Sequence, residues 1–513
     1  MHKRYIALAV ICLAELLVVM DNTIINIALP TLSRELDAGL SGLQWSVDAY
    51  TLTFAGCLLA AGNFGDRYGR RLVLHIGMVG FGISSAVAAT MSDIDGLIAM
   101  RAVMGVFAAA VFPATLALVM VLFTEKRERS IAVGVWAGVA GIGIAAGPVV
   151  SGWLLDNFSW HSVFWINVPI AVVAVIGTAL VVPETKDADP ARLDVLGFVL
   201  STAGIGLLVW SIIEAPRHGW TAPVTVGSGL AAAAILAAFV FWQLRVPAPL
   251  LDVRMFRLRS FGVPAVAISI ASFALFGFVF FFTLYFQAIR GYSPLETGVR
   301  ALPYALGIVL TAPLGMASAR RFGTAPTVAV GLAAMSAGFV AASFADQYTS
   351  YLSVIFPLTV LMGAGLGVIQ GPATELLMSN LPEDDMGVGA AVNDTTREVG
   401  GALGVAVIGS VLSSIYADAI RPQVESSGLP HAVAEAATSS VIGGLEVARR
   451  IPIPELQERA FDAVREAFSQ AIFWTSMTAA IATAVAALIV IAFLPRSAGR
   501  HAPEAPELVD ERT

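Results

Sequence analysis

Apolar residues form long runs along this chain, and short polar segments separate the runs. Fourteen runs reach about 20 residues, the length that a helix needs to cross roughly 30 Å of hydrocarbon. The pattern therefore predicts an all-α integral membrane protein in which every run is a transmembrane helix. The runs lie approximately at 5–30, 43–63, 72–91, 97–122, 131–155, 162–182, 193–213, 222–244, 261–288, 297–318, 325–345, 351–373, 388–415 and 470–494.

The composition supports this prediction. Of the 513 residues, 57% are hydrophobic and 13% are charged, and the mean hydropathy is +0.80, whereas a soluble domain carries roughly a quarter charged residues. The N-terminal stretch has the positive start of a signal peptide, but its apolar run continues to Pro30 without a small-residue cleavage site. We therefore expect the first membrane helix there, not a cleaved leader.

Positive charge is distributed unevenly between the two sides of the predicted helices. The short loops and tails on the side of the N-terminus hold eighteen Lys and Arg residues, and the opposite short loops hold four. The positive-inside rule therefore places both termini in the cytoplasm of a multi-pass cell-membrane protein. Arginine outnumbers lysine 27 to 3, which favours a GC-rich bacterial genome.

The long segment 416–469 is external in this topology. Within it, PELQERAFDAVREAF places Leu456, Phe461, Val464 and Phe468 at helical spacing with charges between them. We expect an amphipathic helix that lies over the outer mouth or on the membrane surface. Two roles remain open for it, a regulatory lid and a plain connecting helix.

Several classes of protein are excluded by missing motifs. The chain has three lysines, none of which follows a glycine, so it lacks the phosphate-binding loop of an ATP-driven pump. It also lacks a nucleophile elbow, a histidine-rich metal site and a haem-type cysteine pair, and Cys12 and Cys57 lie in apolar runs without partner spacing. We expect no enzyme activity, cofactor, metal or nucleic-acid partner, which leaves a secondary transporter or a channel.

The predicted cytoplasmic loop between helices 2 and 3 carries a specific motif, GNFGDRYGRR at residues 62–71. It resembles the pattern G-x-x-x-D-R-x-G-R-R of the major facilitator superfamily, and GMASARRFG at 315–323 is a degenerate copy of it. The resemblance implies two bundles of six helices, 1–190 and 251–513, with the helix hairpin 191–250 inserted between them. We expect Asp66 to hold the inward gate by ion pairing and helix capping, without touching substrate. The residues of this gating motif are Gly62, Asp66, Arg67, Gly69 and Arg70.

The fifth predicted helix contains GIGIAAGPVVSGWL at residues 141–154. This stretch resembles the antiporter motif G-x-x-x-G-P-x-x-G-G of drug exporters, with Ser151 in place of the first glycine of the final pair. Gly143, Gly147 and Gly152 allow another helix to approach closely, and Pro148 bends the helix. Close packing alone is the alternative to a role specific to antiport.

Four further stretches resemble the fourteen-helix drug:proton antiporter family, and within it most closely the exporters of quaternary ammonium compounds and cationic dyes. They are MDNTIINIALP, WSVDAYTL, SWHSVFWINVP and GAAVNDTTREVGGALGVAV. The resemblance implies a monomer that exports lipophilic cations in exchange for protons and is surrounded by membrane lipid. A proton-coupled exporter of an endogenous metabolite or lipid is the alternative within transport, and a channel or scaffold is the alternative from another class.

Charged residues inside the apolar runs are the candidate functional groups. A charge at mid-bilayer costs at least about 2.5 to 3.5 kcal/mol, so such residues persist mainly where they pair, face water or bind substrate. Their helix positions predict that Asp21, Asp48 and Arg101 meet in the outer half of the first bundle. Asp394 and Glu398, four residues apart on one helix face, are expected to face Asp21 across a central space. The full set is Glu15, Asp21, Asp48, Arg101, Asp394, Arg397 and Glu398.

The resemblance also bears on charge and selectivity. The acids Asp394 and Glu398 match acids of the relatives position by position, whereas Asn393 stands where a relative has another acid. Ile308 stands where some relatives carry an acid, and fewer acids favour monovalent over divalent cations.

We hypothesise that a proton and a cation compete for the buried carboxylates. Aromatic rings either contact that cation or simply pack in the core; the candidates are Tyr50, Phe54, Phe276, Phe280 and Tyr285.

Overall fold

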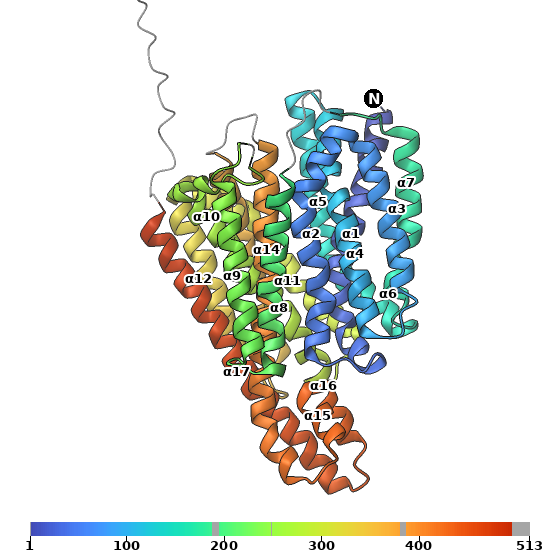
Figure 1. Ribbon diagram of the computed structural model, residues 1–513, viewed down its shortest axis with the longest axis vertical. Coiled ribbons are helices and arrows are strands. Elements are labelled where there is room, and N and C mark those ends of the chain that lie inside the picture. Colours follow the sequence, from blue (N-terminus) through green and yellow to red (C-terminus); the bar gives the residue numbers. More distant parts are fainter. Residues whose placement is uncertain (1, 187–193, 248, 380–385, 495–513) are drawn as a thin grey trace, which may run out of the picture.

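The computed structural model describes residues 2–186, 194–247, 249–379 and 386–494, and these form long helices packed side by side (Figure 1). The first part contains α1 (His2–Glu35), α2 (Leu40–Tyr68), α3 (Arg70–Ala88), α4 (Ile94–Leu122), α5 (Lys126–Asn157), α6 (Ser162–Trp165) and α7 (Asn167–Val181). The middle contains α8 (Val195–His218) and α9 (Pro223–Gln243). The last part contains η1 (Val253–Arg257), α10 (Arg259–Leu284), η2 (Tyr285–Ile289), α11 (Pro294–Phe322), α12 (Thr324–Ala342), η3 (Tyr351–Ile355), α13 (Phe356–Met378), α14 (Met386–Ser426), α15 (His431–Ser439), α16 (Val441–Arg449) and α17 (Pro454–Phe493).

Every predicted apolar run overlaps a helix. Within the described ranges, 13 spans are long and apolar enough to cross a membrane, and α6 and α7 form one of them, Ser162–Val181. Helix α2 is not among the 13; it has 29 residues, enough to span, but carries Asp48 and the polar end that includes Asp66. The predicted fold class, an all-α integral membrane protein, is confirmed.

The last six long helices repeat the packing of the first six. In the first set, α1 packs on α5 and α7, α4 packs on α2 and α3, and α3 packs on α7. In the second set, α10 packs on α14 and α17, α13 packs on α11 and α12, and α12 packs on α17. We call these sets the first and second bundles. They meet along two seams that correspond to each other, α5 against α11 and α2 against α14.

The hairpin α8–α9 lies across one of these seams. Helix α8 contacts both α2 and α14, and Figure 1 shows α8 and α9 side by side next to them. Its Glu214 accepts hydrogen bonds from Ser41 Oγ at 2.7 Å and Trp45 Nε1 at 3.3 Å on α2. On the other side, Ser410 Oγ of α14 donates to the carbonyl of Ile212 at 2.8 Å. The hairpin therefore bridges the two bundles.

The predicted external segment is a helical extension built from the end of α14, α15, α16 and the start of α17. It projects from one end of the molecule in Figure 1, opposite the N-terminus. The expected amphipathic helix exists as the first part of α17, which continues into the last span. A position over the outer mouth or on the membrane surface stays a prediction. Its Val464 and Phe468 are buried, whereas Leu456 is exposed. Helix α16 contacts α1, so the extension also reaches the first bundle.

Candidate functional site

A cavity of about 150 Å³ lies between the two bundles. Most of its wall is apolar or aromatic, and its charged side chains come from α14. The lining residues are Val18, Val19, Asn22, Thr23, Asn26, Tyr50, Phe54, Phe112, Ala140, Ile144, Ser272, Leu275, Phe276, Val279, Tyr304, Ile308, Leu366, Gln370, Arg397 and Glu398. The cavity thus combines helices of both bundles, as expected for a site between two structural repeats.

Helix α14 supplies a cluster of one cation and two carboxylates at the cavity wall. Arg397 Nη1 lies 3.6 Å from Asp394 Oδ1, and Arg397 Nη2 lies 3.2 Å from Glu398 Oε1. The Glu398 side chain is 3% exposed, and its Oε2 has no hydrogen-bond partner among the described residues. Asn393 donates to Asp394 Oδ1 at 3.4 Å and accepts from Thr374 Oγ1 at 3.0 Å. One carboxylate oxygen is therefore left to interact with a proton or a ligand.

Glu15 of α1 adds a third carboxylate near this cluster. Its side chain is fully buried, and neither carboxylate oxygen has a hydrogen-bond partner in the described part of the chain. Arg397 and Asp394 are charged groups close enough to Glu15 to interact with it electrostatically. Two acids of α14 thus share one guanidinium, and α1 contributes a third, buried acid without a partner among the described residues.

Asp21 lies inside the first bundle and does not face the cavity, which corrects the predicted arrangement across from Asp394 and Glu398. Its Oδ2 accepts from Arg101 Nη1 at 2.6 Å, and its Oδ1 accepts from Asn167 Nδ2 at 2.7 Å. Arg101 also donates from Nε to the carbonyl of Ser46 at 3.0 Å and stacks on the Tyr50 ring at 4.3 Å. The predicted meeting of Asp21 and Arg101 is observed. Asn167 was missed, although it lies in the SWHSVFWINVP stretch.

Asp48 does not join this pair, contrary to the prediction. It is fully buried, and neither of its carboxylate oxygens has a partner among the described residues. It lies one turn from Gln44, whose Nε2 donates to the carbonyls of Val405 and Ala406 on α14 at 3.1 and 3.0 Å. A helix turns about 100° per residue, so Asp48 shares the face of Gln44 and points away from Tyr50. Asp48 therefore faces the seam between α2 and α14.

In the gating motif, Arg70 donates from Nε and Nη2 to Asp66 Oδ1 at 2.9 and 2.7 Å. The expected helix cap comes from another residue. Glu184 accepts from the backbone N–H groups of Arg71 and Leu72, both at 3.0 Å, at the start of α3. The capping role assigned to Asp66 is thus a wrong prediction, since Glu184 approaches the helix end from beyond α7.

The remaining motif residues shape the turn itself. Gly69 has a φ of 124°, and a Cβ there would lie 2.7 Å from Glu184 Oε1, so this position requires glycine. Arg67 lies over the Tyr68 ring at 5.9 Å. A Cβ at Gly62 would make an ordinary 3.9 Å contact with Pro113.

The glycines of the antiporter motif place α5 against two helices. A Cβ at Gly143 would lie 3.1 Å from Val19 of α1, and one at Gly147 would overlap Thr23 of α1. A Cβ at Gly152 would lie 2.5 Å from Leu295 Cα of α11, and the backbone of Pro148 lies against Gly298 of the same helix. The motif thus joins the first bundle internally and also joins it to the second.

The outer side of the cavity is closed and the inner part of the α5–α11 seam is open. On the outer side, Gln287 Nε2 donates to the carbonyl of Ile27 at 2.9 Å, and Ser293 Oγ donates to Asp156 Oδ2 at 2.9 Å. Toward the cytoplasmic end of α5, a Cβ at Gly134 or Gly138 would meet no atom of the described residues within 4 Å. The contacts between the bundles thus lie on the outer side of the cavity, which is the pattern of an inward-facing arrangement.

The aromatic candidates divide into two groups. Tyr50, Phe54 and Phe276 line the cavity. Phe280 is fully buried in the core, and Tyr285 donates its hydroxyl to the carbonyl of Asp346 at 2.7 Å. The prediction that these two residues offer ring faces to a ligand in the cavity is wrong, because neither of them lines it.

Two helical bundles around a cavity at their interface define a membrane transporter, not an enzyme. Residues 11–405 match the Major Facilitator Superfamily, and the chain belongs to this family. It is a multi-pass protein of the cell membrane that transports small molecules.

The chain is similar to several characterised proteins over most of its length. It is 32% identical over 495 residues to the multidrug efflux pump LfrA of Mycolicibacterium smegmatis, which covers 96% of each chain. It is 36% identical over 412 residues to the puromycin resistance protein pur8 of Streptomyces alboniger, covering 80% of this chain and 82% of pur8. It is 31% identical over 492 residues to the methyl viologen resistance protein SmvA of Salmonella typhimurium, covering 96% of this chain and 97% of SmvA.

A solved structure supports the fold. A bacterial homolog of the human lysosomal transporter Spinster, in an inward-facing and unoccupied conformation, superimposes with a TM-score of 0.62 at 15% identity. The match covers 96% of this chain and 98% of that chain. At this identity the likeness concerns the fold alone.

Proposed function

We propose that this protein is a drug exporter that moves lipophilic cations out of the cell in exchange for protons. The observation that carries the proposal is the Glu398 carboxylate at the wall of a largely apolar cavity, with one oxygen that has no partner among the described residues. Apolar walls favour a lipophilic molecule, and an acid favours a positive one.

The charge balance supports competition between substrate and proton. Asp394 and Glu398 share the single guanidinium of Arg397, and Glu15 is a further buried acid without a hydrogen-bond partner among the described residues. A site with more carboxylates than cations is stabilised by one further positive charge, whether this is a proton on a carboxyl group or the charge of a bound drug. Binding of the drug then releases the proton, and proton uptake from the outer side displaces the drug.

The cavity surface favours cations over other substrate classes. Phe54 and Phe276 line the cavity, and aromatic rings attract cations within about 6 Å. Arg397 is the one basic residue among those that line the cavity of the described chain, and it is engaged by Asp394 and Glu398. Acidic substrates therefore lack a partner. The names of the relatives, which include a multidrug efflux pump and antibiotic resistance proteins, support export.

The test uses proteoliposomes or everted vesicles with an acidic interior, in which a quenched dye follows the pH gradient while ethidium or a quaternary ammonium compound is added. We expect gradient discharge that requires the added cation. Glu398→Gln and Asp394→Asn should each lower the rate of cation-dependent discharge by about tenfold or more. A tenfold change corresponds to roughly 1.4 kcal/mol, and we expect the removal of a paired charge to cost at least this much. Glu435→Gln serves as the control, because the Glu435 side chain is 74% exposed in the outer extension.

The alternative outcome is equally clear. If folded, inserted protein discharges no gradient with any cation, drug export is excluded. An exporter of an endogenous metabolite or lipid then becomes the leading function.

A further inference from the structure

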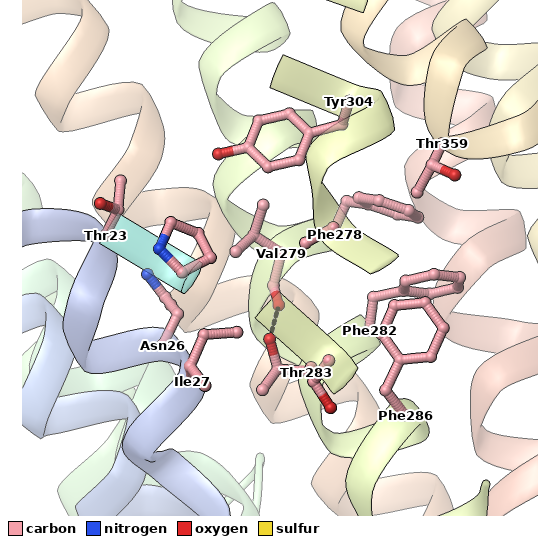
Figure 2. Close-up of a pocket in the computed structure, with 13 residues that line it drawn as sticks. Thr23, Asn26, Ile27, Phe278, Val279, Phe282, Thr283, Phe286, Tyr304 and Thr359 are labelled. Atoms are coloured by element: carbon pink, nitrogen blue, oxygen red, sulfur yellow. Dashed lines mark hydrogen bonds between the residues drawn. The ribbon is translucent and has the colours of Figure 1, made fainter. Parts of the chain in front are cut away.

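A smaller pocket lies beside the central cavity, on its closed, outer side. This pocket has a volume of about 30 Å³. Thr23, Asn26, Val279 and Tyr304 line both spaces, so the two are adjacent. Figure 2 shows side chains of α1 on one side of the pocket, the phenylalanines of α10 on the other, and Tyr304 above them.

Aromatic rings from one helix form much of the wall. Phe278 and Phe282 stack with ring centroids 4.5 Å apart, and Phe282 meets Phe286 edge-on at 4.7 Å. All three are side chains of α10 or η2 (Figure 2). Such a wall attracts hydrocarbon by burying apolar area.

The hydroxyl groups of the wall are mostly occupied. Thr283 Oγ1 donates to the carbonyl of Val279 at 2.9 Å, the dashed line in Figure 2, and Thr359 Oγ1 donates to the carbonyl of Ile355 at 2.5 Å. Thr297 contributes a buried hydroxyl that has no partner among the described residues. No charged side chain lines the pocket in the described chain. Its ligand group is therefore uncharged.

The charged groups lie in the larger of the two spaces. Arg397 and Glu398 line the larger cavity and do not line the small pocket. An elongated ligand with its positive head near Glu398 consequently extends its apolar part toward Phe282. The site has a charged end and a hydrocarbon end.

We propose that the small pocket is a subsite for the end of a hydrocarbon tail, so that the protein selects amphiphilic cations by the length of a single alkyl arm. The inference rests on the proposed function and adds to it the shape of the substrate. A space that holds one water needs roughly 10–15 Å³, so 30 Å³ accommodates only the last few atoms of a tail. The pocket therefore discriminates between substrates by the length of the tail and not by its bulk.

The experiment measures cation-dependent discharge of the pH gradient with n-alkyltrimethylammonium ions of increasing tail length. In the wild type, each added methylene should lower the half-saturating concentration by about fourfold, equivalent to about 0.8 kcal/mol per buried methylene, until the tail fills the pocket. Beyond that length the concentration stays constant. The length at this break is the quantity to compare.

Three variants separate volume from polarity. Ala301→Leu adds about three carbon atoms to the wall and should move the break to a shorter tail by about two or three methylenes. Ile27→Ala removes about three carbon atoms from the opposite wall and should move it to a longer tail. Thr297→Val keeps the volume and should leave the break unchanged. Ala317→Leu, on an exposed part of the same helix as Ala301, is the control for added bulk.

The outcomes distinguish the two proposals. Discharge by short-tail cations with an unchanged break in both Ala301→Leu and Ile27→Ala overturns the tail subsite and leaves cation export intact. A break that moves in Ala317→Leu as far as in Ala301→Leu also overturns it. Wild-type protein without discharge at any tail length overturns the proposed function, and the subsite with it.

Discussion

The pair of Asp21 and Arg101 is the shortest and most buried ion pair among the described residues of the first bundle. Arg101 is fully buried and Asp21 is 2% exposed, so solvent screens their 2.6 Å contact very little. Asn167 and the carbonyl of Ser46 satisfy further polar atoms of the pair. Removal of one partner leaves an uncompensated charge away from water, which is the costly event for a buried ion pair.

We expect Arg101→Met to lower the free energy of unfolding by about 3–5 kcal/mol. In the double variant Arg101→Met, Asp21→Asn, the loss of unfolding free energy should be smaller than the sum of the two single losses by more than about 1 kcal/mol, because both charges are then absent. Denaturant or thermal unfolding in detergent measures the cycle. Arg217→Met is the matched control, since the Arg217 side chain is 68% exposed in its pair with Glu214. Additive single changes would refute the coupling.

Asp48 presents the opposite case, a buried carboxyl group without a partner in the described structure. An unsatisfied buried polar group costs about 1–3 kcal/mol. Asp48→Leu should therefore raise the free energy of unfolding of the inward-facing protein by a similar amount. If Asp48 takes part in proton movement, the same variant should also lower transport. A higher melting temperature together with reduced cation-driven discharge is the expected pair of results. A lower melting temperature would contradict this account of the α2–α14 seam.

At the scale of elements, the sequence predicts what depends on local pattern. The apolar runs predict the helices, because length and hydrophobicity alone determine whether a segment can span a membrane. The side to which a charged residue points depends on which helix packs against it. The prediction therefore pairs Asp21 correctly with Arg101 but wrongly turns it toward the cavity, and it gives Asp48 the wrong neighbours.

Contacts between distant segments explain the other errors. Glu184 binds the backbone of Arg71, 113 residues earlier, and no local motif connects them. The amphipathic pattern near Val464 does predict a helix, but its apolar stripe packs on α16 and other protein elements. Periodicity shows that a face is buried and does not show whether lipid or protein covers it.

The base of the α8–α9 hairpin offers a pH-dependent test. Asp194 accepts from Gly197 N at 2.9 Å, Trp242 Nε1 at 2.8 Å and Gln243 Nε2 at 2.6 Å. Partial burial opposes the charged form, but the hydrogen bonds together outweigh it and lower the pKa of Asp194. An aspartate whose pKa is lower in the folded state than in the unfolded state stabilises the fold at any pH above its unfolded pKa of about 3.9. This stabilisation is lost as the pH falls through the folded-state pKa.

We accordingly expect Asp194→Asn to destabilise the protein by about 1–2 kcal/mol at pH 7. Because protonation removes the same charge from the wild type, the difference between the two proteins should shrink as the pH falls below about 4. Thermal unfolding of both proteins across this range measures the difference. Asp418→Asn is the control, because the Asp418 side chain is 73% exposed. If the difference in stability between wild type and Asp194→Asn grew toward acid pH, this would contradict a lowered pKa of Asp194.

At the scale of the whole molecule, the repeated packing of the two bundles makes the seams the places where shape can change. The outer parts of α5 and α11 are in backbone contact, whereas the Gly134 and Gly138 positions face open space. An outward-facing state requires that the outer parts of α5 and α11 separate and that their inner parts come into contact. The α8–α9 hairpin, which bonds to α2 and to α14, accompanies any such movement.

Gly152→Ala tests this description directly. The added Cβ would lie 2.5 Å from both Leu295 Cα and Pro294 O, and backbone atoms cannot turn aside as a side chain can. Overpacking of this kind costs about 1–3 kcal/mol, and it is relieved when the outer seam opens. The ratio of outward- to inward-facing protein should therefore rise by about 5- to 150-fold.

Spin labels at Asn157 on α5 and at Tyr348 beside the second bundle, both exposed, would report the outer separation in a background without Cys12 and Cys57. Gly152→Ala should add a longer distance to the distribution. Gly134→Ala introduces the same methyl group where a Cβ would meet no described atom within 4 Å, so it should leave the distribution unchanged. Identical distributions in Gly152→Ala and Gly134→Ala would mean that the α5–α11 seam does not control the opening of the outer side.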